Sequence, residues 1–550
     1  MATFSFTSSQ ANALRLVNPT QYSARDYPGG VMTYSFWGQT ANGTQGTAEG
    51  RSGGYQLNNG NPVRYFLNVP ADIRTTVEEQ LANISKFINL TFTRVDDSGF
   101  EYSRDRDRSQ RGRIRIMIDG NGDSLGSAHM PHALGAGAHP GETFYRPWPN
   151  GTRSTTGVQR KERWTRQGQT LVSSTNYLCD LIIHELQHSL GLGHGHDAGT
   201  GINGVFTEHS PETDNVWNTV QSYNRPLGTG EEGDRGAIIA TSMPDDIAGL
   251  QSIYGSKNFN HANTTYTFSR GDLYLADSNQ QLLDSRIVAA RTANINTLDD
   301  SGGYDTIDCS GLDSEFVAEG VRIDMNPGGY IISKNDWLNT VSYTDNWGNQ
   351  NGEEVTGVPR KGTRLSWRTT IEKCQGTERG ADTIIGNIAD NWIAGYGGND
   401  FLQGLNGNDT LIGGPGADQF FGGAGADLIY LGRGGGEQDA DRDRVDFTAA
   451  SESTQAAPDR VYGFGANDIF DLNDIDANTR IAGKQIFAFI GTAAFSGTAG
   501  QLRAAAASGI GTKGFIQADL NGDRVADFSV ALTGDSMLAT NLTMSNFVLR

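Results

Sequence analysis

Residues 377–430 read TERGADTII GNIADNWIA GYGGNDFLQ GLNGNDTLI GGPGADQFF GGAGADLIY, a run of consecutive nine-residue units. The eighth residue of every unit is apolar: Ile384, Ile393, Leu402, Leu411, Phe420 and Ile429. The sixth is Asp382, Asn391, Asp400, Asp409, Asp418 and Asp427, and the fourth is Gly380, Gly398, Gly407, Gly416 and Gly425, with Ala389 as the exception. A flexible linker would not keep its apolar residues in phase, so the repeat predicts a regular stack of short strands.

The residue types within each unit point to a metal ion. Glycine permits the left-handed backbone of a tight turn, which aims carbonyl groups at an ion, while the sixth-position carboxylate supplies negative charge. The apolar eighth residue begins a strand that stacks on its equivalents above and below. This is the nonapeptide pattern of a calcium-binding parallel β-roll. Without calcium the stacked carboxylates would repel one another, so we expect folding to be coupled to calcium binding.

The composition of the 550-residue chain agrees with several domains that bind divalent cations. It contains 72 Gly, 63 Asp+Glu and 43 Lys+Arg, with a formal net charge of -20. Such an acidic, glycine-rich chain argues against a nucleic-acid partner. The cysteines Cys179, Cys309 and Cys374 are too few for a disulfide framework and are expected to be small buried residues. No stretch reaches the ~18 apolar residues of a membrane span.

Upstream of the repeats, helical and strand-like segments alternate. Strands are predicted at 32–38, 90–95 and 113–118, and helices at 75–90, 177–192 and 244–254. Helical periodicity nearly disappears after a linker at 256–265. The chain is therefore predicted to be an α+β, multidomain protein, with a leader or pro-segment at 1–29, an N-terminal domain at 30–255 and a β-rich domain at 256–550.

The helix at 177–192 contains the start of HELQHSLGLGHGH, residues 184–196. His184 and His188 are four residues apart, so both imidazoles project from one face of a helix, which is the spacing that a zinc ion needs. Glu185 lies beside the metal without being a ligand. It is therefore the candidate base that takes a proton from the attacking water.

The residues after His188 are expected to turn the chain back toward this zinc site. Gly191 can adopt a left-handed conformation that ends the helix. His194 then completes a three-histidine zinc site. His196 lies outside this pattern and is interpreted as a loop residue.

The extended sequence H-E-x-x-H-x-x-G-x-x-H is the zinc signature of the metzincin peptidases. Combined in this order with the nonapeptides, it resembles the serralysins, secreted zinc endopeptidases with a C-terminal calcium-binding RTX domain. The family is also resembled by TYSFWG at 33–38, MPDDIAGLQSIYG at 243–255, DDSGGYDTIDCSGLD at 299–313, TIEKCQGTERGADTIIGN at 370–387 and the stretch at 459–472. The resemblance implies a metzincin catalytic domain followed by a calcium-binding parallel β-roll and a β-sandwich C-terminal domain.

The resemblance also implies roles for single residues. Tyr223, in TVQSYN at 219–224, matches a tyrosine that ligates zinc at rest and stabilises the transition state. Gln221 stands where the family has a methionine beneath the zinc. SLGSAHMP at 124–131 matches the edge strand that pairs with an extended substrate. The calcium ligands implied outside the nonapeptides are Arg270, Asp272, Asp300, Gly302, Gly303, Asp305 and Glu372 before the roll, and Asp459 after it.

Three further segments bear on calcium and export. DGNGD at 119–123 and DLNGDRVAD at 519–527 have alternating oxygen ligands that suit calcium, and acid-rich turns without an ion explain them equally well. The final residues, SNFVLR, resemble the family's uncleaved C-terminal secretion signal, with Asn546 in place of an acidic residue. This resemblance implies export through a type I secretion apparatus.

Together these features predict a secreted, extracellular zinc metalloendopeptidase, made as a zymogen, that hydrolyses proteins and peptides. It is expected to be a monomer with one catalytic Zn²⁺ and several structural Ca²⁺ ions, and without a nucleic-acid partner or a membrane span. The competing interpretation is a non-enzymatic secreted calcium-binding adhesin or surface-layer protein with a relic protease head. Gln221 is the one residue that favours it.

Overall fold

The computed structural model describes residues 30–36, 66–67, 71–96, 114–119, 126–128, 142–145, 182–193, 217–221, 225–226, 238–239, 241–258, 262–269, 272–275, 294–312, 320–334, 337–338, 341–344, 350–355, 358–359, 362–435, 440–507 and 511–549. The chain forms two compact units. The first comprises Met1–Phe259, Asn279–Asp299 and Leu338–Arg368, and the second Asn260–Ser278, Asp300–Trp337 and Thr369–Arg550. The predicted pro-segment at 1–29 lies outside the described residues, and the predicted domain boundary at 255/256 stays a prediction.

The first unit contains a mixed sheet with the strand order β3-β1-β4-β6-β5. Its strands are β1 (Val31–Phe36), β3 (Thr91–Arg94), β4 (Ile114–Asp119), β5 (Gly126–Ala128) and β6 (Glu142–Tyr145), and β2 (Phe66–Leu67) pairs with β4. β1 is parallel to β3 and β4, and β4 is parallel to β6. β5 is antiparallel to β6 and ends the strand order, which agrees with the edge strand expected at 124–131.

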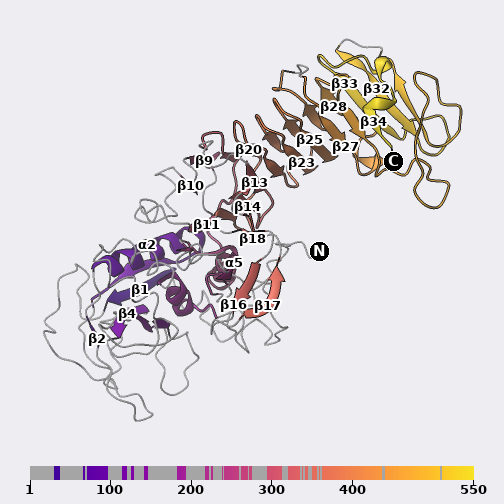
Figure 1. The fold of residues 1–550 in the computed structure, drawn as a ribbon. Coiled ribbons are helices and arrows are strands. Elements are labelled where there is room, and N and C mark those ends of the chain that lie inside the picture. Colours follow the sequence, from indigo (N-terminus) through magenta and orange to yellow (C-terminus); the bar gives the residue numbers. More distant parts are fainter. Residues whose placement is uncertain are drawn as a thin grey trace. The chain divides into compact units, whose positions relative to one another are not determined.

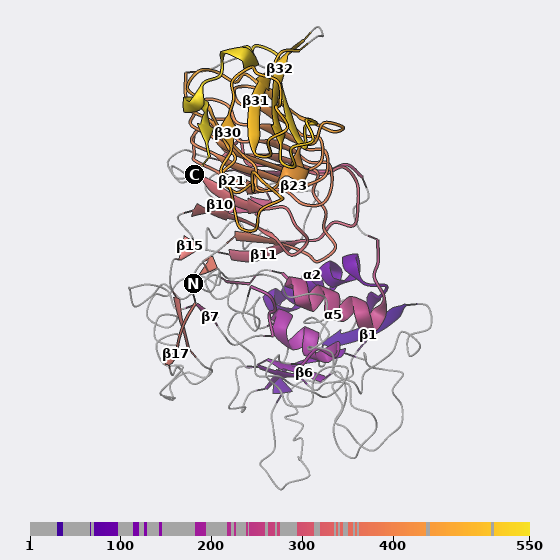
Figure 2. The ribbon, with the colours of Figure 1, turned by 90° about the vertical axis from the view of Figure 1, so that its right-hand side faces the viewer.

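Within the described residues, three helices pack against this sheet through one apolar core. They are α2 (Ala71–Phe87), a helix over residues 182–189, and α5 (Pro244–Tyr254), whose predicted bounds are confirmed and which ends at Gly255 with φ 82°. α2 and α5 lie side by side next to β1 (Figures 1 and 2). The core contains, among others, Met32, Phe36, Val77, Leu81, Ile116, Leu186, Leu190 and Leu250. Each such side chain contributes about 1.5–3 kcal/mol when it is fully buried.

Later segments of the chain complete the first unit. β8 (Ile238–Ile239), β11 (Asn294–Leu298) and β19 (Gly362–Leu365) are parallel neighbours, while β7 (Arg225–Pro226), β16 (Val341–Thr344) and β17 (Gln350–Val355) form an antiparallel sheet. β15 (Trp337–Leu338) and β18 (Val358–Pro359) are two-residue strands. The fully buried Arg364 donates from Nη1 to Asn218 Oδ1 at 3.2 Å, and Trp367 Nε1 donates to Asp245 Oδ1 at 2.7 Å. Residues downstream of 255 therefore support the core of the N-terminal unit.

The second unit contains the predicted parallel β-roll, whose coils add strands alternately to two sheets (Figure 1). One sheet contains β10 (Asp272–Leu275), β9 (Thr265–Ser269), β12 (Thr306–Asp308), β20 (Lys373–Gln375), β22 (Trp392–Ala394), β24 (Thr410–Ile412), β26 (Leu428–Tyr430) and β28 (Asp459–Tyr462). The other contains β14 (Tyr330–Ser333), β13 (Val321–Asp324), β21 (Thr383–Ile385), β23 (Phe401–Asn406), β25 (Gln419–Ala424), β27 (Arg444–Asp446), β29 (Ile469–Asp471) and β34 (Phe547–Val548).

The nine-residue phase sets the interior of this roll. Ile384, Leu402 and Phe420 align in register across β21, β23 and β25, and Ile393, Leu411 and Ile429 align across β22, β24 and β26. All of these side chains are 0% exposed. The stacked eighth residues thus form the hydrophobic core of the roll, as the sequence predicts.

The C-terminal end extends the first sheet of the roll with four strands, of which β31, β32 and β33 are antiparallel neighbours. β28 is parallel to β33 (Phe528–Thr533), which pairs with β32 (Thr512–Asp519), followed by β31 (Gln501–Ala505) and β30 (Ala488–Phe489). Short 3₁₀ helices occupy Ala450–Glu452, Ala539–Asn541 and Met544–Asn546. Cys309 and Cys374 are free and buried, as expected, and Cys179 lies outside the described residues. None of the helices in the described part of the chain has the length and apolar content needed to cross a membrane.

Candidate active site and metal sites

The helix over residues 182–189 ends in a turn that glycine makes possible. Gly191 has φ 105°, as the sequence predicts, and its N–H donates to the His188 carbonyl at 3.0 Å. Leu192 N–H donates to the Gln187 carbonyl at 3.0 Å, which completes a Schellman motif. The turn brings the Leu192 carbonyl back to within 2.6 Å of His188 Nδ1.

The two described histidines face each other with their Nε2 atoms 3.0 Å apart, and their rings are nearly perpendicular at 87°. His184 Nδ1 lies 3.0 Å from the Val220 carbonyl, and His188 Nδ1 lies 2.6 Å from the Leu192 carbonyl. Carbonyl oxygens only accept hydrogen bonds, so Nδ1 is the protonated nitrogen of each ring and Nε2 has the lone pair. Two lone pairs at this distance repel unless a cation lies against both, so this pair fits a zinc ion.

Glu185 is next to this pair and is 4% exposed. Its Oε2 atom is buried without a hydrogen-bond partner among the described residues. Burial raises the pKa of Glu185 to about 8, from 4.5. A buried carboxyl group whose pKa is raised in this way is suited to accept and release a proton.

The remaining predicted zinc-site residues, His194 and Tyr223, lie outside the described residues, as do His196 and Arg270. Within the described part of the chain, no three His, Cys, Asp or Glu side chains form a metal-binding group. This is consistent with a zinc site of which two ligands are described, and with calcium sites that draw most of their ligands from backbone carbonyls.

The sixth-position carboxylates form two ladders along the roll. In one, the backbone N–H groups of Asp382, Asp400 and Asp418 donate to Oδ1 of Asp400, Asp418 and Asp443 at 2.7–2.8 Å. In the other, those of Asn391, Asp409 and Asp427 donate to Oδ1 of Asp409, Asp427 and Asp459 at 2.7–2.9 Å. Every one of these side chains is at most 2% exposed.

The first ladder continues from Asp443 to Asp468, whose Oδ1 accepts from Asp443 N–H at 2.9 Å, and its two ends differ from the other positions in the second carboxylate oxygen. Oδ2 is buried without a hydrogen-bond partner in Asp400, Asp409, Asp427 and Asp459, counted over the described residues. At the ends, Asp382 Oδ2 accepts from Thr377 N–H at 2.6 Å, and Asp468 Oδ2 accepts from Gly465 N–H at 2.6 Å. Buried carboxylate oxygens without partners need a cation, so the middle of the ladders fits calcium.

Asn391 differs from the aspartates around it. Its Oδ1 accepts from Asn387 N–H at 2.7 Å, and its Nδ2 donates to the Ile371 carbonyl at 3.2 Å. Both ends of the amide are thus satisfied by protein groups.

Two ladder residues, Asp443 and Asp468, were not predicted from the sequence. The spacing from Asp418 to Asp443 is 25 residues, as it is from Asp443 to Asp468, against 18 within the nonapeptides. The longer loops before Asp443 and Asp468 shift these residues out of the nine-residue repeat, so the repeat does not predict them. The sequence pattern that could have found them is an aspartate two residues before a buried apolar side chain, Val445 or Phe470.

A further acidic cluster precedes the roll, where the sequence predicts a calcium site. Asp305 N–H donates to Glu372 Oε2 at 2.7 Å, and Asp300 Oδ1 accepts from Gly302 N–H at 3.0 Å. Burial and the neighbouring Asp300 and Glu372 raise the pKa of Asp305 to about 7. Gly303 has φ 142°, and a Cβ there would lie 2.7 Å from the Ala262 carbonyl oxygen. Asp272 is on β10, and its side chain is outside the described atoms.

In the loop at 519–527, the aspartate side chains accept hydrogen bonds from backbone N–H groups of the same loop. Asp519 accepts from Gly522 N–H at 2.6 Å and from Arg524 N–H at 2.9 Å, one bond to each oxygen. Asp527 Oδ2 accepts from Leu520 N–H at 2.8 Å. These bonds favour the interpretation as acid-rich turns without an ion. Of the loop at 119–123, only Asp119 lies within the described residues.

Comparisons with known proteins identify both halves of the chain. The model of the matrixin peptidase family matches residues 55–216, which include the histidine site. The model of the RTX calcium-binding nonapeptide repeat matches residues 377–411 and 403–436, which include most of the ladders.

Several bacterial metalloproteases are similar to longer parts of the chain. The metalloprotease AprA of Pseudomonas entomophila (strain L48) is 29% identical over 429 residues, 75% of this chain and 73% of that protein. The metallopeptidase AprA of Pseudomonas marginalis is 30% identical over 375 residues, 66% of this chain and 63% of that protein. The serralysin of Proteus mirabilis is 30% identical over 228 residues, 41% of this chain and 39% of that protein. The chain belongs to the serralysin family. Its match spans less than two thirds of two of these three relatives.

Within this serralysin-family chain, Gln221 is part of a buried polar network. It is 0% exposed, and its Nε2 donates to the His184 carbonyl at 3.0 Å and to Gln187 Oε1 at 3.1 Å. Gln187 in turn donates to Ser242 Oγ at 2.9 Å. The glutamine thus lies against the backbone of the histidine helix, and its partner Gln187 belongs to the same helix.

Asp246, at the start of α5, anchors the turn that contains Gln221. Its Oδ2 accepts from Val220 N–H and from Met243 N–H, both at 2.9 Å, and its Oδ1 accepts from Thr219 Oγ1 at 2.5 Å. Burial raises the pKa of Asp246 to about 6, against the lowering effect of these hydrogen bonds. The same turn presents the Val220 carbonyl to His184.

Gln221→Met is expected to destabilise this chain by about 1–3 kcal/mol, because it leaves Gln187 Oε1 buried without its donor. Gln187→Leu combined with Gln221→Met should cost less than the sum of the two single changes by at least ~0.5 kcal/mol, since both partners of one hydrogen bond are then removed together. Urea unfolding with zinc and calcium present measures both quantities. Additive effects would show that the two glutamines do not act as a pair.

Proposed function

We propose that the chain is a secreted zinc metalloendopeptidase with a C-terminal roll that folds around calcium. The observation that supports this most is the convergence of His184 and His188 Nε2 atoms, each fixed through Nδ1, beside the buried Glu185. Peptide hydrolysis needs an activated water, a polarised carbonyl and a proton carrier. His184, His188 and His194 would hold the zinc ion, which supplies water activation and carbonyl polarisation when bound.

Glu185 is the proton carrier in this proposal. Its carboxylate accepts a proton from the attacking water and donates it to the leaving amine as the C–N bond breaks. Tyr223 would donate a hydrogen bond to the oxyanion, a role that rests on the family resemblance. β5 ends the order of its sheet, so an extended substrate could add as a further antiparallel strand.

The carboxylate ladders support calcium-coupled folding of the roll. Their buried, unpartnered oxygens make the ion-free fold costly. Protein and peptide substrates, synthesis as a zymogen, export through a type I secretion apparatus, an extracellular location and a monomeric state are part of the same proposal and rest on the family. The alternative, a calcium-binding protein with a relic protease head, predicts zinc binding without hydrolysis.

Casein hydrolysis by the purified chain in constant calcium tests the proposal. Phenanthroline, a chelator that prefers zinc to calcium, should abolish cleavage while leaving the β signal in circular dichroism unchanged. Stoichiometric zinc added back after removal of the chelator should restore cleavage. A zinc-loaded, folded chain that does not cleave casein would favour the relic-protease alternative, and cleavage indifferent to phenanthroline would exclude zinc catalysis.

A further inference from the structure

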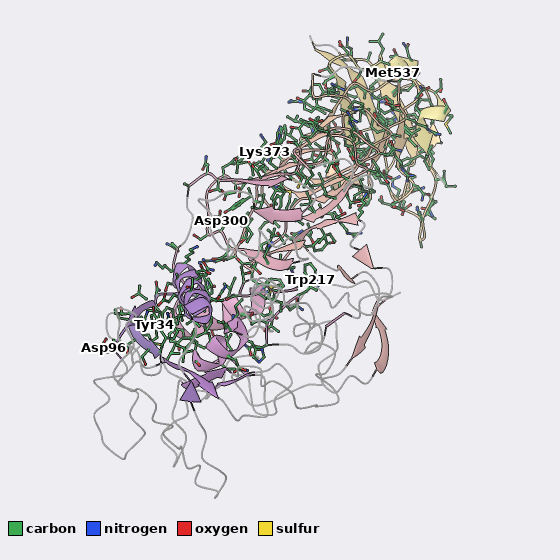
Figure 3. The ribbon with its side chains drawn as sticks, turned by 60° about the vertical axis from the view of Figure 1, so that its left-hand side comes forward. Tyr34, Asp96, Trp217, Asp300, Lys373 and Met537 are labelled. Carbon is green, nitrogen blue, oxygen red and sulfur yellow. The ribbon has the colours of Figure 1, made fainter. Side chains whose placement is uncertain are left out.

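A groove of about 750 Å³ is lined by residues of the β-roll, among them Gly398 of the nonapeptide turns. Its lining includes Trp392, Tyr396, Arg379, Arg433, Gly413 and Gly414. β20 with Lys373, which Figure 3 labels, lies next to the Trp392 strand β22. The side chains of Trp392, Tyr396, Arg379 and Arg433 have no role in the sites discussed above.

Tyr396 occupies a backbone position that ordinarily excludes side chains. Its φ is 74°, in the left-handed region, and Gly414, one ladder step of 18 residues later, has φ 111°. A bulky residue in this conformation is strained, and Leu405 has the same conformation at the equivalent position of the next repeat, with φ 81°, so this backbone belongs to the repeat turn. The Tyr396 side chain is 37% exposed, and its hydroxyl accepts a hydrogen bond from Gln375 Nε2. The hydrogen bond from Gln375 therefore holds a partly exposed aromatic ring at the groove.

Trp392 is the second ring of the groove, and it is also held in place. Lys373 Nζ lies 4.3 Å from the centre of the indole, within cation–π distance. Indole and phenol rings together offer flat apolar surface with polar atoms at the edges. Sugar rings have a matching character, because their C–H faces are apolar and their hydroxyl groups point outward.

Charge decides which sugars fit. Arg379 and Arg433 are exposed, and neither forms an ion pair with a carboxylate of the described residues. The chain as a whole has a net charge of -20, so two guanidinium groups at one groove that lack a carboxylate partner within the described ranges differ from the acidic background. Guanidinium groups bind carboxylates through paired hydrogen bonds. Glu378 is the one acidic residue in the lining.

We propose that this groove binds an acidic oligosaccharide, with sugar rings packed on Trp392 and Tyr396 and uronate carboxylates bound by Arg379 and Arg433. Gly397, Gly398, Gly413 and Gly414 also line the groove and have no side chains that would fill it. The site is separate from peptide hydrolysis, so it would tether the protein to an acidic polysaccharide whether or not the histidine site is active.

Isothermal titration of the full chain in constant calcium tests this with three probes. A hyaluronan hexasaccharide alternates glucuronate with N-acetylglucosamine, chitohexaose supplies neutral sugar rings, and hexaglutamate supplies carboxylates without rings. The hexasaccharide is expected to bind more tightly than either of the others. No binding of the hexasaccharide, or binding equal to that of hexaglutamate or chitohexaose, would overturn the proposal.

Tyr396→Gly is the decisive variant, because it removes the ring and relieves the left-handed strain, so the roll should fold at least as well. It should weaken hexasaccharide binding roughly tenfold. Leu405→Gly is the matched control, since Leu405 has φ 81° and is absent from the groove lining. Equal weakening by both variants would assign the effect to the backbone and overturn the proposal.

The double variant Arg379→Ala with Arg433→Ala should reduce both hexasaccharide binding and the salt dependence of that binding. Unchanged binding would show that the arginines do not bind the uronate carboxylates, which would overturn the proposal.

Discussion

Replacing Glu185 by glutamine should lower kcat/KM for peptide hydrolysis by about 10²–10⁴-fold, the usual contribution of a positioned proton carrier. The amide has the same shape but cannot accept the proton of the attacking water. Zinc content should stay at the native level, because the proposed ligands are histidines. Stability should not fall, since Glu185 is 4% exposed and burial already disfavours its charged form. Peptide-hydrolysis assays measure kcat/KM, metal analysis measures the zinc content, and thermal melts measure the stability.

The matched control for this variant is Glu78→Gln. It makes the same chemical change on α2, where the Glu78 side chain is 39% exposed and pairs with Arg94 at 3.0 Å. A surface ion pair of this kind contributes roughly 0–1 kcal/mol, so the control should retain native kinetics. If Glu185→Gln hydrolyses peptides as well as the control does, Glu185 is not the proton carrier.

Removal of calcium should unfold the roll at neutral pH. At a thousandfold excess of calcium over the dissociation constant, each site contributes about 4 kcal/mol, and several such sites exceed the ~5–15 kcal/mol that stabilises a typical domain. The β signal of the full chain in circular dichroism should therefore fall in EGTA and return with calcium. Asp409→Asn should raise the calcium concentration needed, whereas Asp474→Asn, at a side chain that is 67% exposed, should not.

The calcium-free chain should also respond to pH in the opposite sense from the calcium-loaded chain. Burial raises the pKa of Asp409 to about 7 and that of Asp459 to about 8, both from 3.8. A folded-state pKa above the unfolded value means that the folded chain keeps protons the unfolded chain has released. Its stability is therefore highest near pH 4 and is lost as pH rises toward 7–8.

With calcium bound, the same carboxylates must be ionised, so acid weakens binding and lowers stability. Chemical denaturation at pH 5 and pH 8, in EGTA and in calcium, gives the comparison. A calcium-free roll that is more stable at pH 8 than at pH 5 would show that the ladder carboxylates are paired with something other than calcium.

Some predictions from the sequence depended only on regular spacing, and these agree with the structure. The bounds of α5 follow from its periodicity and from Gly255, and the left-handed Gly191 follows from the end of the histidine helix. The in-phase burial of Ile384, Leu402 and Phe420 follows from the nine-residue repeat. In each case the period of the backbone converts residue number directly into direction, so no long-range contact has to be known.

Other features depended on contacts between distant segments. Asp443 and Asp468 continue a ladder across loops that break the nine-residue phase. Gln221 stands beneath the histidine helix as a departure from the family, and only its bonds to His184 and Gln187 show how the site accommodates it.

The sequence by itself determined which residues could meet: the histidines one helical turn apart, the glutamate beside them and the carboxylates at every ninth position. The tertiary structure decided which of these groups keep an oxygen or nitrogen atom available to a metal ion. Val220 and Leu192 carbonyls direct the histidine lone pairs toward one point, and Thr377 satisfies Asp382 while Asp400 keeps a bare oxygen. The physical reason is that spacing follows from local backbone geometry, whereas the need for a cation depends on every donor that the fold brings near.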